Sequence, residues 1–458
     1  MKVIICGAGQ VGFSIARYLA SEGNDVTIID QSPELIRRIS DTVDVQGIVG
    51  HASNPDVLER GGAEDANMII AVTYADEVNM VACQVAHSLF NVPTKIARIR
   101  QQSYLQPMWA DLFLRDHMPI DVIISPEIEV ARAVTRRLRV PGAFEMIPLA
   151  GDKVRLLGVR CEQDCPLVHT PLRQLTQLFP DLNIVITGLT RDGLPIVPTA
   201  DDQMLPGDGV YFVVDTEQVS RAMAAFGHEE LEARRLLICG GGNVGLFLAE
   251  EIERDYSWVN AKIVEANEQR AGLVASRLNR TIVIKGDVLD PEILEEAGVA
   301  ATDTVVAVTN DDETNILASL LAKRYGCQRA ITLINKGSYE SLIPSLGIVV
   351  VVSPSNITVS TILQHVRRGR IHSVHTLREG FGEIIEAEAQ ATSPLVGKPL
   401  KDVNLPPGVL IGALVRNDKV ISPRGSTIIQ AKDRVVLFSS SEAIRKVEKL
   451  FSVSLDFF

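Results

Sequence analysis

The 458-residue chain carries one sequence pattern twice, and this repeat limits what the chain can fold into. Residues 3–12 read VIICGAGQVG, and residues 236–245 read LLICGGGNVG. Residues 71–90 begin with AVTYADEVN, and residues 307–326 begin with AVTNDDETN. Self-similarity at a nearly constant spacing is the signature of a duplicated structural unit. We therefore expect two copies of one architecture.

Each copy ends in a second, smaller part. Residues 189–214 match residues 414–439 at an offset of 225, and both stretches alternate polar and apolar residues with turn residues between short runs. This pattern is typical of a small β-rich domain. The predicted order is a large unit followed by a small unit, and then both again. The predicted domain boundaries are 1–125, 140–225, 233–355 and 371–455.

The large units alternate strand-like apolar runs with helical patterns, which favours a parallel sheet with helices on both faces. We predict an α/β fold class, with two Rossmann-like doubly wound parallel-sheet domains, each followed by a small α+β domain. The predicted strands of the first unit are 2–6, 26–29, 45–49, 68–72, 94–98 and 121–124. Those of the second unit are 235–239, 262–265, 281–285, 304–308, 330–334 and 347–352.

Two predicted helices, at about 126–138 and 354–367, connect each large unit to the small unit that follows it. Both carry apolar residues at helical spacing, including Val134 in one and Ile362 in the other. An apolar stripe must be buried against another element. We expect each helix to pack against the other large unit.

A G-x-G-x-x-G motif, Gly7, Gly9 and Gly12, follows the first predicted strand and opens a helix. In dinucleotide-binding folds the first glycine makes a tight turn, the second lets the backbone approach a pyrophosphate, and the third lets helix and strand pack closely. The helix N-terminus offers free N–H groups to phosphate. Asp30 ends the next strand, where a carboxylate accepts hydrogen bonds from ribose hydroxyls.

The second large unit repeats the motif with Gly240, Gly242 and Gly245, and Glu265 takes the place of the acid. A lone glycine motif is weak evidence, but strand, helix and acid are all correctly placed in both units. An acid at this position disfavours a 2′-phosphate, so the pattern favours NAD(H) or another adenosine nucleotide over NADP(H).

Polar residues follow other predicted strands at the edge where ligands of open α/β sheets bind. Arg98 ends its strand, where a guanidinium can contact a phosphate. The candidates in the first unit are His51, Ser53, Thr73, Tyr74 and Arg98, and those in the second are Asp287, Thr309, Asn310 and Asn335.

Several function classes are excluded by missing motifs. None of the seven tyrosines starts a Tyr-x-x-x-Lys pair, and there is neither a GxxxxGK[ST] nor a GxSxG motif. The spacing of Cys161, Cys165 and His169 lacks a fourth ligand, so we predict no metal site. We predict no catalytic residues and therefore a nucleotide sensor. An NAD-dependent oxidoreductase of a small molecule is the alternative.

Composition narrows the partners and the compartment. The net charge of −12 argues against nucleic acid as the main partner. The longest apolar runs are far shorter than the ~20 residues that span a bilayer, and the N-terminus reaches glycines before a signal-peptide core could form. The expectation is a cytoplasmic protein that can still dock on a membrane protein.

These segments resemble the regulator-of-K⁺-conductance (RCK) domain family, along essentially the whole chain. The large units resemble the N-terminal (Trk-N) part and the small units the C-terminal (Trk-C) part. The resemblance is carried by MKVIICGAGQVG, DEVNMVACQVAHSLFNVPTKIARIR, AVTNDDETNI and LPPGVLIGALVRNDKVISPRGSTIIQAKDRVVLF. It implies a cytosolic gating subunit of a Trk-type potassium uptake system. Another ion transporter, such as a chloride or proton-coupled antiporter, is the alternative partner.

The resemblance also implies ligands and assembly. Such proteins bind NAD(H), and ATP or ADP competes at related sites. Rings of this kind hold eight RCK units, so a chain with two units is expected to form a tetramer on the cytoplasmic face of the inner membrane, bound to an integral-membrane potassium-translocating subunit. The implied first site is Gly7, Ala8, Gly9, Gln10, Val11 and Gly12 with Asp30, His51, Thr73, Tyr74 and Arg98. The implied second site is Gly240, Gly241, Gly242, Asn243, Val244 and Gly245 with Glu265, Asp287 and Thr309.

Overall fold

The computed structural model describes residues 1–179, 182–340, 342–348, 350–366, 370–377 and 381–451. Residues 452–455 of the fourth predicted domain and residue 367 of the second predicted connecting helix lie outside this range. The chain divides into two compact units. The first unit is Met1–Glu129 with Pro354–Ile362, and the second is Val130–Ser353 with Leu363–Phe458.

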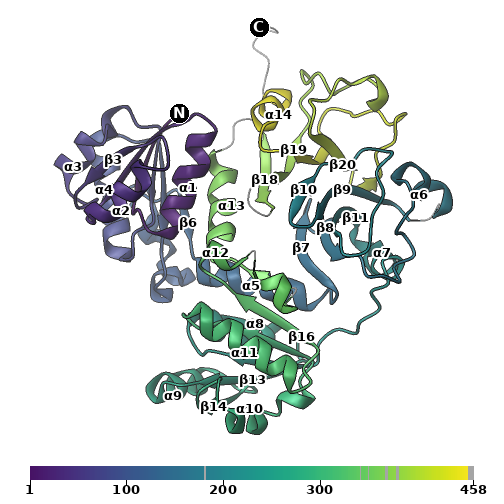
Figure 1. Cartoon of the computed structure of the whole chain (residues 1–458). Helices are drawn as coiled ribbons and strands as arrows, with labels where there is room; N and C mark the ends of the chain where they lie inside the picture. Colours follow the sequence, from purple (N-terminus) through teal and green to yellow (C-terminus); the bar gives the residue numbers. More distant parts are fainter. Residues whose placement is uncertain (180–181, 341, 349, 367–369, 378–380, 452–458) are drawn as a thin grey trace. The chain divides into compact units, whose positions relative to one another are not determined.

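The first unit contains the first α/β domain, built on a six-stranded sheet whose strands are all parallel (Figure 1). The strand order is β3-β2-β1-β4-β5-β6. The chain therefore starts in the middle of the sheet, adds β2 and β3 on one side of β1, and then crosses back to add β4, β5 and β6 on the other side. This order is typical of a doubly wound fold. The strands are β1 (Lys2–Cys6), β2 (Asp25–Asp30), β3 (Gln46–Val49), β4 (Met68–Ala71), β5 (Thr94–Arg98) and β6 (Val122–Ile124).

Helices cover both faces of this sheet. Cys6 of β1 packs with Cys83 of α4 in one apolar cluster, whereas Ile5 lies beside Gly12 of α1. Neighbouring strand residues point to opposite faces, so α1 and α4 lie on opposite sides. The helices are α1 (Gln10–Ser21), α2 (Pro33–Ser40), α3 (Pro55–Arg60) and α4 (Asp76–Phe90), with the 3-10 helices η1 (Ala63–Asp65), η2 (Gln102–Leu105) and η3 (Pro107–Phe113).

The second α/β domain lies in the second unit and repeats this architecture. Its parallel sheet has the order β14-β13-β12-β15-β16-β17. The strands are β12 (Arg235–Cys239), β13 (Asn260–Glu265), β14 (Ile282–Lys285), β15 (Thr304–Ala307), β16 (Arg329–Leu333) and β17 (Val350–Val352). The helices are α8 (Asn243–Asp255), α9 (Glu268–Arg277), α10 (Pro291–Ala297), η5 (Val299–Ala301), α11 (Asp312–Arg324), α12 (Gly337–Glu340) and η6 (Ile343–Leu346).

Two small domains, also in the second unit, are built on five-stranded antiparallel sheets. Their strand orders are β10-β9-β11-β8-β7 and, read from the opposite edge, β21-β20-β22-β19-β18. Strands that correspond in the two copies of the repeat therefore occupy the same places in the two sheets. The first small domain has β7 (Ala143–Leu149), β8 (Val154–Arg160), α6 (Leu172–Leu178), β9 (Ile184–Arg191), β10 (Leu194–Ile196), β11 (Gly209–Asp215), η4 (Thr216–Gln218) and α7 (Val219–Ala225). The second has β18 (Ile371–Thr376), β19 (Glu383–Glu388), η7 (Leu400–Asp402), β20 (Val409–Arg416), β21 (Lys419–Ile421), β22 (Arg434–Ser439) and α14 (Ile444–Phe451).

The repeat extends to single side chains of the small domains. Arg191 donates two hydrogen bonds to Asp208, at 2.9 and 2.8 Å. Arg416, 225 residues later, donates two to Asp433, at 2.8 and 2.7 Å. The two sheets share one apolar cluster, which includes Tyr211 of β11. The predicted fold class, two doubly wound α/β domains each followed by a small α+β domain, is confirmed.

The connecting helices are α5 (Pro126–Leu138) and α13 (Pro354–Val366). Residues 130–138 of α5 belong to the second unit, where Thr135 lies close to Glu251 of α8. Residues 354–362 of α13 are grouped with the first α/β domain in the first unit. These placements agree with the prediction that each connecting helix packs against the other large unit.

No helix among the described residues combines the length and the apolar character that a bilayer span requires.

Candidate nucleotide-binding sites

The first glycine loop has the conformation that its sequence demands. Gly7 has a φ of +108°, and a Cβ atom there would come within 3.1 Å of the backbone of Thr73. A Cβ atom at Gly12 would lie only 1.8 Å from the carbonyl oxygen of Gly7. At Gly9, by contrast, a Cβ atom would meet nothing within 4 Å. The backbone is thus packed against the protein at Gly7 and Gly12, whereas Gly9 faces open space. The free space at Gly9 fits the approach of a pyrophosphate.

Asp30, at the end of β2, holds this loop. Its Oδ2 accepts a hydrogen bond from the backbone N–H of Ala8 at 2.7 Å, and its Oδ1 accepts one from the backbone N–H of Ser32 at 2.8 Å. Gln10 and Val11 form the first turn of α1, whose leading N–H groups have no partner within the helix. The carboxylate is therefore fixed against the short loop that leads into the N-terminus of α1.

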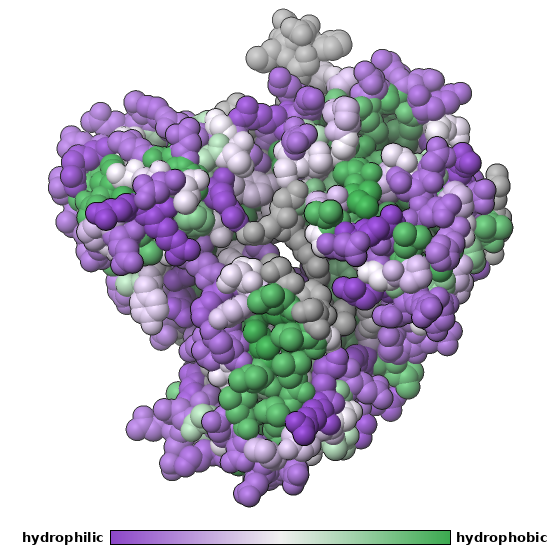
Figure 2. Space-filling model, in the orientation of Figure 1, coloured by the Kyte–Doolittle hydropathy of each residue, from purple (hydrophilic) through white to green (hydrophobic). Residues whose placement is uncertain are grey.

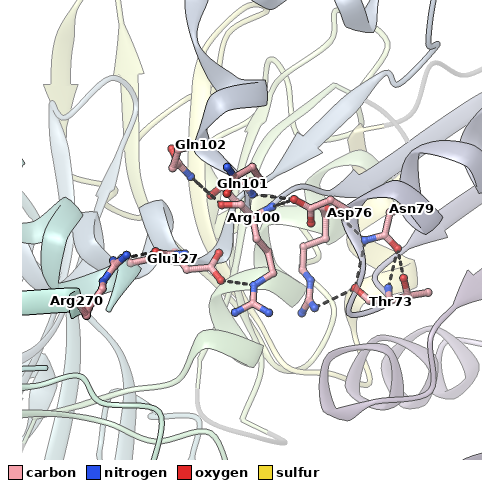
Figure 3. A network of polar contacts seen from close by, with 11 residues as sticks. Thr73, Asp76, Asn79, Arg100, Gln101, Gln102, Glu127 and Arg270 are labelled. Atoms are coloured by element: carbon pink, nitrogen blue, oxygen red, sulfur yellow. Dashed lines mark hydrogen bonds and ion pairs between the residues drawn. The ribbon is translucent and has the colours of Figure 1, made fainter. Parts of the chain in front are cut away.

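The end of β4 is fixed by Asn79, a fully buried residue of α4. Its Oδ1 accepts hydrogen bonds from the backbone N–H (2.8 Å) and the hydroxyl (2.7 Å) of Thr73, as Figure 3 shows. Its side-chain amide donates to the carbonyl oxygens of Thr73 (3.2 Å) and Arg98 (2.9 Å). One side chain thus ties the ends of β4 and β5 together beside the glycine loop.

Arg98 projects into this corner. Its Nη2 donates to the carbonyl oxygen of Thr73 at 3.0 Å. Its Nε is buried and has no hydrogen-bond partner among the described residues. Burial, and then the charge of Arg100, lower the pKa of Arg98 from its ordinary value. A nearby anion would offset this unfavourable burial of charge.

Arg100 joins three parts of the first site (Figure 3). Its backbone N–H donates to Oδ2 of Asp76 at 2.9 Å, and its Nε donates to Oε1 of Glu127 on α5 at 2.7 Å. Its guanidinium lies over the ring of Tyr74, 5.2 Å from the centroid. Tyr74 itself is 84% exposed. The aromatic ring and the cation form the outer rim of the site.

His51 stands apart from these contacts. Its Nδ1 lies 2.7 Å from the hydroxyl of Ser53, in the loop after β3. That loop is adjacent to β2, because the N–H of Gly50 donates to the carbonyl oxygen of Asp30 at 2.9 Å. Within the described residues no hydrogen bond links His51 to the glycine loop, so its ligand role stays a prediction.

The second glycine loop has the same geometry. Gly240 has a φ of +109°, and its Cβ atom would lie 3.1 Å from the backbone nitrogen of Thr309. A Cβ atom at Gly245 would lie 2.0 Å from the carbonyl oxygen of Gly240, and one at Gly242 would meet nothing within 4 Å. Asn243 and Val244 open α8. This loop also fits a pyrophosphate.

Glu265 holds the second loop as Asp30 holds the first. Its Oε2 accepts a hydrogen bond from the N–H of Gly241 at 2.7 Å. The second loop has an additional cation, Arg270 of α9, whose Nε donates to the carbonyl oxygen of Gly241 (2.7 Å) and whose Nη2 donates to Oδ1 of Asn243 (3.1 Å). The first domain has Leu35 at the equivalent position.

The end of β15 is tied to β16 by Asn315. Its Oδ1 accepts from the backbone N–H and hydroxyl of Thr309, both at 2.8 Å, and its amide donates to the carbonyl oxygen of Leu333 at 3.0 Å. Asp287 lies in the loop after β14, where its Oδ1 accepts from the N–H of Leu289 at 2.9 Å. The hydrogen bonds of Asn315 in the second site therefore repeat those of Asn79 in the first.

The sequence analysis did not identify the buried residues that fix the strand ends at the two sites, nor the cations beside them. Asp76 and Asn79 in the first copy, and Asp312 and Asn315 in the second, occupy the same positions in the repeated segments. Because both polar residues occur in both copies of the repeat, the sequence could have indicated their role. Arg100, Glu127 and Arg270 have no such signal, since each differs between the two copies.

Two domain-family models each match two segments of the chain. The TrkA-N domain model matches residues 3–126 and 236–354, and the TrkA-C domain model matches residues 156–227 and 384–452.

Curated relatives match along their full length. A Trk system potassium uptake protein TrkA from Azorhizobium caulinodans is 56% identical over 458 residues, which is 100% of both chains. Proteins of the same name from Vibrio alginolyticus and Haemophilus influenzae are 41% and 37% identical, over 99% and 100% of both chains.

Solved structures with this fold are more distant in sequence. The GsuK RCK domain has a TM-score of 0.60 at 18% identity and covers 98% of this chain and 94% of its own. The GsuK channel bound to NAD has a TM-score of 0.60 at 18% identity and covers 98% of this chain and 78% of its own.

Proposed function

The chain belongs to the family of Trk system potassium uptake proteins TrkA, and we propose that it is the nucleotide-sensing regulatory subunit of such a system. The family consists of subunits of ion-uptake systems rather than of enzymes. The ligand proposed for both glycine loops is NAD(H), with ATP or ADP as competing ligands. When bound, such a nucleotide supplies binding free energy that differs between conformations; no chemical change of the nucleotide is required.

One observation carries the nucleotide assignment. In both α/β domains a carboxylate at the end of the second strand accepts a hydrogen bond from a glycine-loop N–H at 2.7 Å, from Ala8 to Asp30 and from Gly241 to Glu265. Each carboxylate is thereby fixed beside a helix N-terminus, at the position where a ribose diol is bound in dinucleotide-binding folds. We propose as ligand contacts the two glycine loops, both acids, His51, Thr73, Tyr74, Arg98, Asp287 and Thr309.

The proposed partner is an integral-membrane potassium-translocating subunit, contacted from the cytoplasmic face of the inner membrane. Assembly is proposed to be a homotetramer, with eight α/β domains in a ring. The four domains are proposed to span 1–125, 140–225, 233–355 and 371–455.

Exposed apolar surface on both α/β domains supports self-association. Figure 2 shows apolar side chains gathered over the region of α11. Leu317 of α11 and Leu342 beside η6 are 49% and 57% exposed. In the first α/β domain, Leu89 of α4 and Trp109 of η3 are 58% and 53% exposed. Apolar patches of this kind mark protein contacts.

The proposed signal is a population shift. A nucleotide in the first site contacts the corner formed by β4, β5 and Arg100, and Arg100 is bound to Glu127 at the start of α5. That helix continues into the second unit. Nucleotides that bind one arrangement of this helix better than another shift the population by that difference in affinity, typically 1–3 kcal/mol of coupling.

The test is a flux measurement. An integral-membrane subunit of a Trk-type potassium uptake system is reconstituted in vesicles, and potassium flux is followed with the protein added and with NADH, NAD⁺, ATP or ADP present. The expected result is a flux that depends on both the protein and the nucleotide. A flux that ignores the protein would refute the regulatory role, and steady oxidation of NADH with any small carbonyl substrate would refute the sensor assignment.

A further inference from the structure

The first small domain contains two neighbouring cysteines that lie outside both candidate nucleotide sites. Cys161 directly follows β8, and Cys165 comes four residues later. Both belong to the apolar cluster of this domain, and they are 0% and 3% exposed. Residues 162–164 between them are exposed, and so is Pro166. The two thiols therefore lie just inside a short surface loop.

Backbone hydrogen bonds fix the path of this loop. The N–H of Cys161 donates to the carbonyl oxygen of Asp208 at 2.8 Å, and the N–H of Gly207 donates to the carbonyl oxygen of Cys161 at 2.7 Å. The N–H of Cys165 donates to the carbonyl oxygen of Glu162 at 3.2 Å, which closes a tight turn. Cys161 is thus held at the end of its strand, and the turn brings Cys165 back toward it.

The two sulfur atoms lie close to each other, since each thiol is the largest cause of the change in the other's pKa. The Cys165 thiol, and then burial, raise the pKa of Cys161. The Cys161 thiol lowers the pKa of Cys165, and the backbone at Leu167 and Val168 adds to this effect against burial. Because the thiolate is the reactive form of cysteine, Cys165 is the nucleophile of the pair.

The other four cysteines of the chain are different. Burial raises the pKa of Cys6 and Cys239 to about 12, and it also raises the pKa of Cys83 and Cys327. Buried thiols of this kind are inert. All six cysteines are free, so these four are controls for the reactivity of the pair within the same chain.

The second small domain forms the same loop without thiols. At an offset of 228 residues, Ala389 and Ser393 stand where the first domain has its two cysteines. The N–H of Ala389 donates to the carbonyl oxygen of Asp433 at 2.9 Å, and the N–H of Ser393 donates to that of Gln390 at 2.9 Å. The backbone of this loop therefore does not depend on sulfur. What the cysteine pair adds to the first small domain is chemical reactivity.

We propose that Cys161 and Cys165 form a modification site, at which hydrogen peroxide converts the two thiols into an intramolecular disulfide. The proposal is independent of nucleotide binding, because it concerns a different domain and different chemistry. Disulfides in cytosolic proteins are usually transient and redox-sensing, and a thiol reductant is expected to reverse this one.

The reaction has two steps. The thiolate of Cys165 attacks one oxygen of the peroxide, the O–O bond breaks, and the leaving hydroxide takes up a proton to form water. The sulfur of Cys161 then attacks the resulting sulfenic acid, so that the S–S bond forms, the S–O bond breaks, and a second water leaves with the proton of Cys161. The two sulfurs together lose two electrons, and one peroxide is reduced to two waters.

Peptide mapping tests the proposal in the full-length protein. The native chain is treated with hydrogen peroxide, unfolded in N-ethylmaleimide, digested with trypsin and analysed by mass spectrometry. Both cysteines fall in one tryptic peptide, residues 161–173. We expect this peptide to become two hydrogen atoms lighter and unlabelled, at least about tenfold faster than any of the other four cysteines is lost. Dithiothreitol added before the label should restore both thiols.

Matched variants assign the two roles, and each installs the residue of the second small domain. Cys161→Ala should stop the reaction at the sulfenic acid, which dimedone then labels on Cys165. Cys165→Ser should leave Cys161 unoxidised and take up no dimedone. Cys327→Ala is the control and should form the disulfide as the wild type does. Circular dichroism checks folding, and the wild-type peptide map decides the case if a variant is unfolded.

Several results would overturn the inference. One is a 161–173 peptide that keeps both thiols or loses them no faster than the other four cysteines. Others are a disulfide between two chains instead of within one, and direct oxidation of Cys165 to the sulfinic acid in the wild type.

Discussion

Nε of Arg100 donates a hydrogen bond to Oε1 of Glu127 at 2.7 Å, and this contact joins the rim of the first candidate nucleotide site to the start of α5. Other contacts restrict both residues. The backbone N–H of Arg100 is bound to Asp76 at 2.9 Å, and the side chain of Glu127 is only 12% exposed. A nucleotide phosphate that attracts Arg100 competes directly with Glu127, so the ion pair is suited to report occupancy of the site to the helix.

The first prediction is that Glu127→Gln uncouples regulation from binding. The amide keeps the shape of the side chain but removes its charge, which weakens the bond to Arg100. We expect NADH and ATP to bind at least as tightly as they do to the wild type, because glutamine competes less for Arg100, while the nucleotide dependence of potassium flux in reconstituted vesicles becomes much smaller. Glu217→Gln, in the exposed turn η4, is the control and should leave both unchanged. A flux response equal to that of the wild type would show that this ion pair carries no signal.

A second prediction concerns the acid of the first loop. Asp30→Ala removes the acceptor for the N–H groups of Ala8 and Ser32 and for a ribose diol, so NADH binding should weaken by about 1.5–3 kcal/mol. The wild-type protein should bind NADPH much more weakly than NADH, and the substitution should narrow that difference because the repelling charge is gone. Fluorescence titration of the reduced nicotinamide measures both. Equal wild-type affinities for NADH and NADPH would refute the assignment of this carboxylate.

The parts of the fold that follow local rules could be predicted from the sequence. The strands, the glycine loops and the positions of Asp30 and Glu265 depend on apolar runs, on glycines where no Cβ atom fits, and on spacing along one βαβ unit. The repeat strengthened each of these predictions, because every signal occurred twice.

The rest of the site depends on contacts between residues far apart in the chain. Arg100 and Glu127 are 27 residues apart, and Arg270 is 29 residues from the carbonyl oxygen it contacts. No periodicity or sequence motif predicts either contact. Asn79 could have been found, because Asn315 occupies the same position in the second copy of the repeat.

A third prediction concerns the connecting helices. Val134 of α5 and Ile362 of α13 are both 0% exposed within the single chain. Replacing either with Glu buries an unpaired charge and should destabilise the fold itself by several kcal/mol. Thermal unfolding should show a clearly lower Tm for both variants, whatever their oligomeric state. A wild-type Tm combined with a smaller assembly would instead mean that these side chains face another copy of the chain.

A fourth prediction is a loss of stability in mild acid that involves His375 of β18. Burial, and then the charge of Arg136, lower the pKa of His375 from 6.5 to about 4. The unfolded chain therefore binds a proton at a higher pH than the folded chain does. The stabilising contribution is complete above pH 6.5, shrinks as the pH falls below it, and is lost by about pH 4. Urea unfolding between these pH values should show a smaller decline for His375→Gln than for the wild type. Identical declines would mean that His375 is already protonated in the native protein.

The last prediction separates folding from assembly. Leu317 of α11 is 49% exposed and Trp109 of η3 is 53% exposed, so a charge at either position remains in water in the isolated chain and should not lower its Tm. If these surfaces are the contacts between copies in a ring, Leu317→Glu and Trp109→Glu place charges in an apolar interface and should dissociate it. Light scattering should give a wild-type mass of four chains and smaller species for both variants. Leu194→Glu, at a leucine that is 69% exposed in β10 of the first small domain, is the matched control and should leave the mass unchanged. A tetramer that tolerates both α/β-domain substitutions would place the ring contacts on other surfaces of the chain.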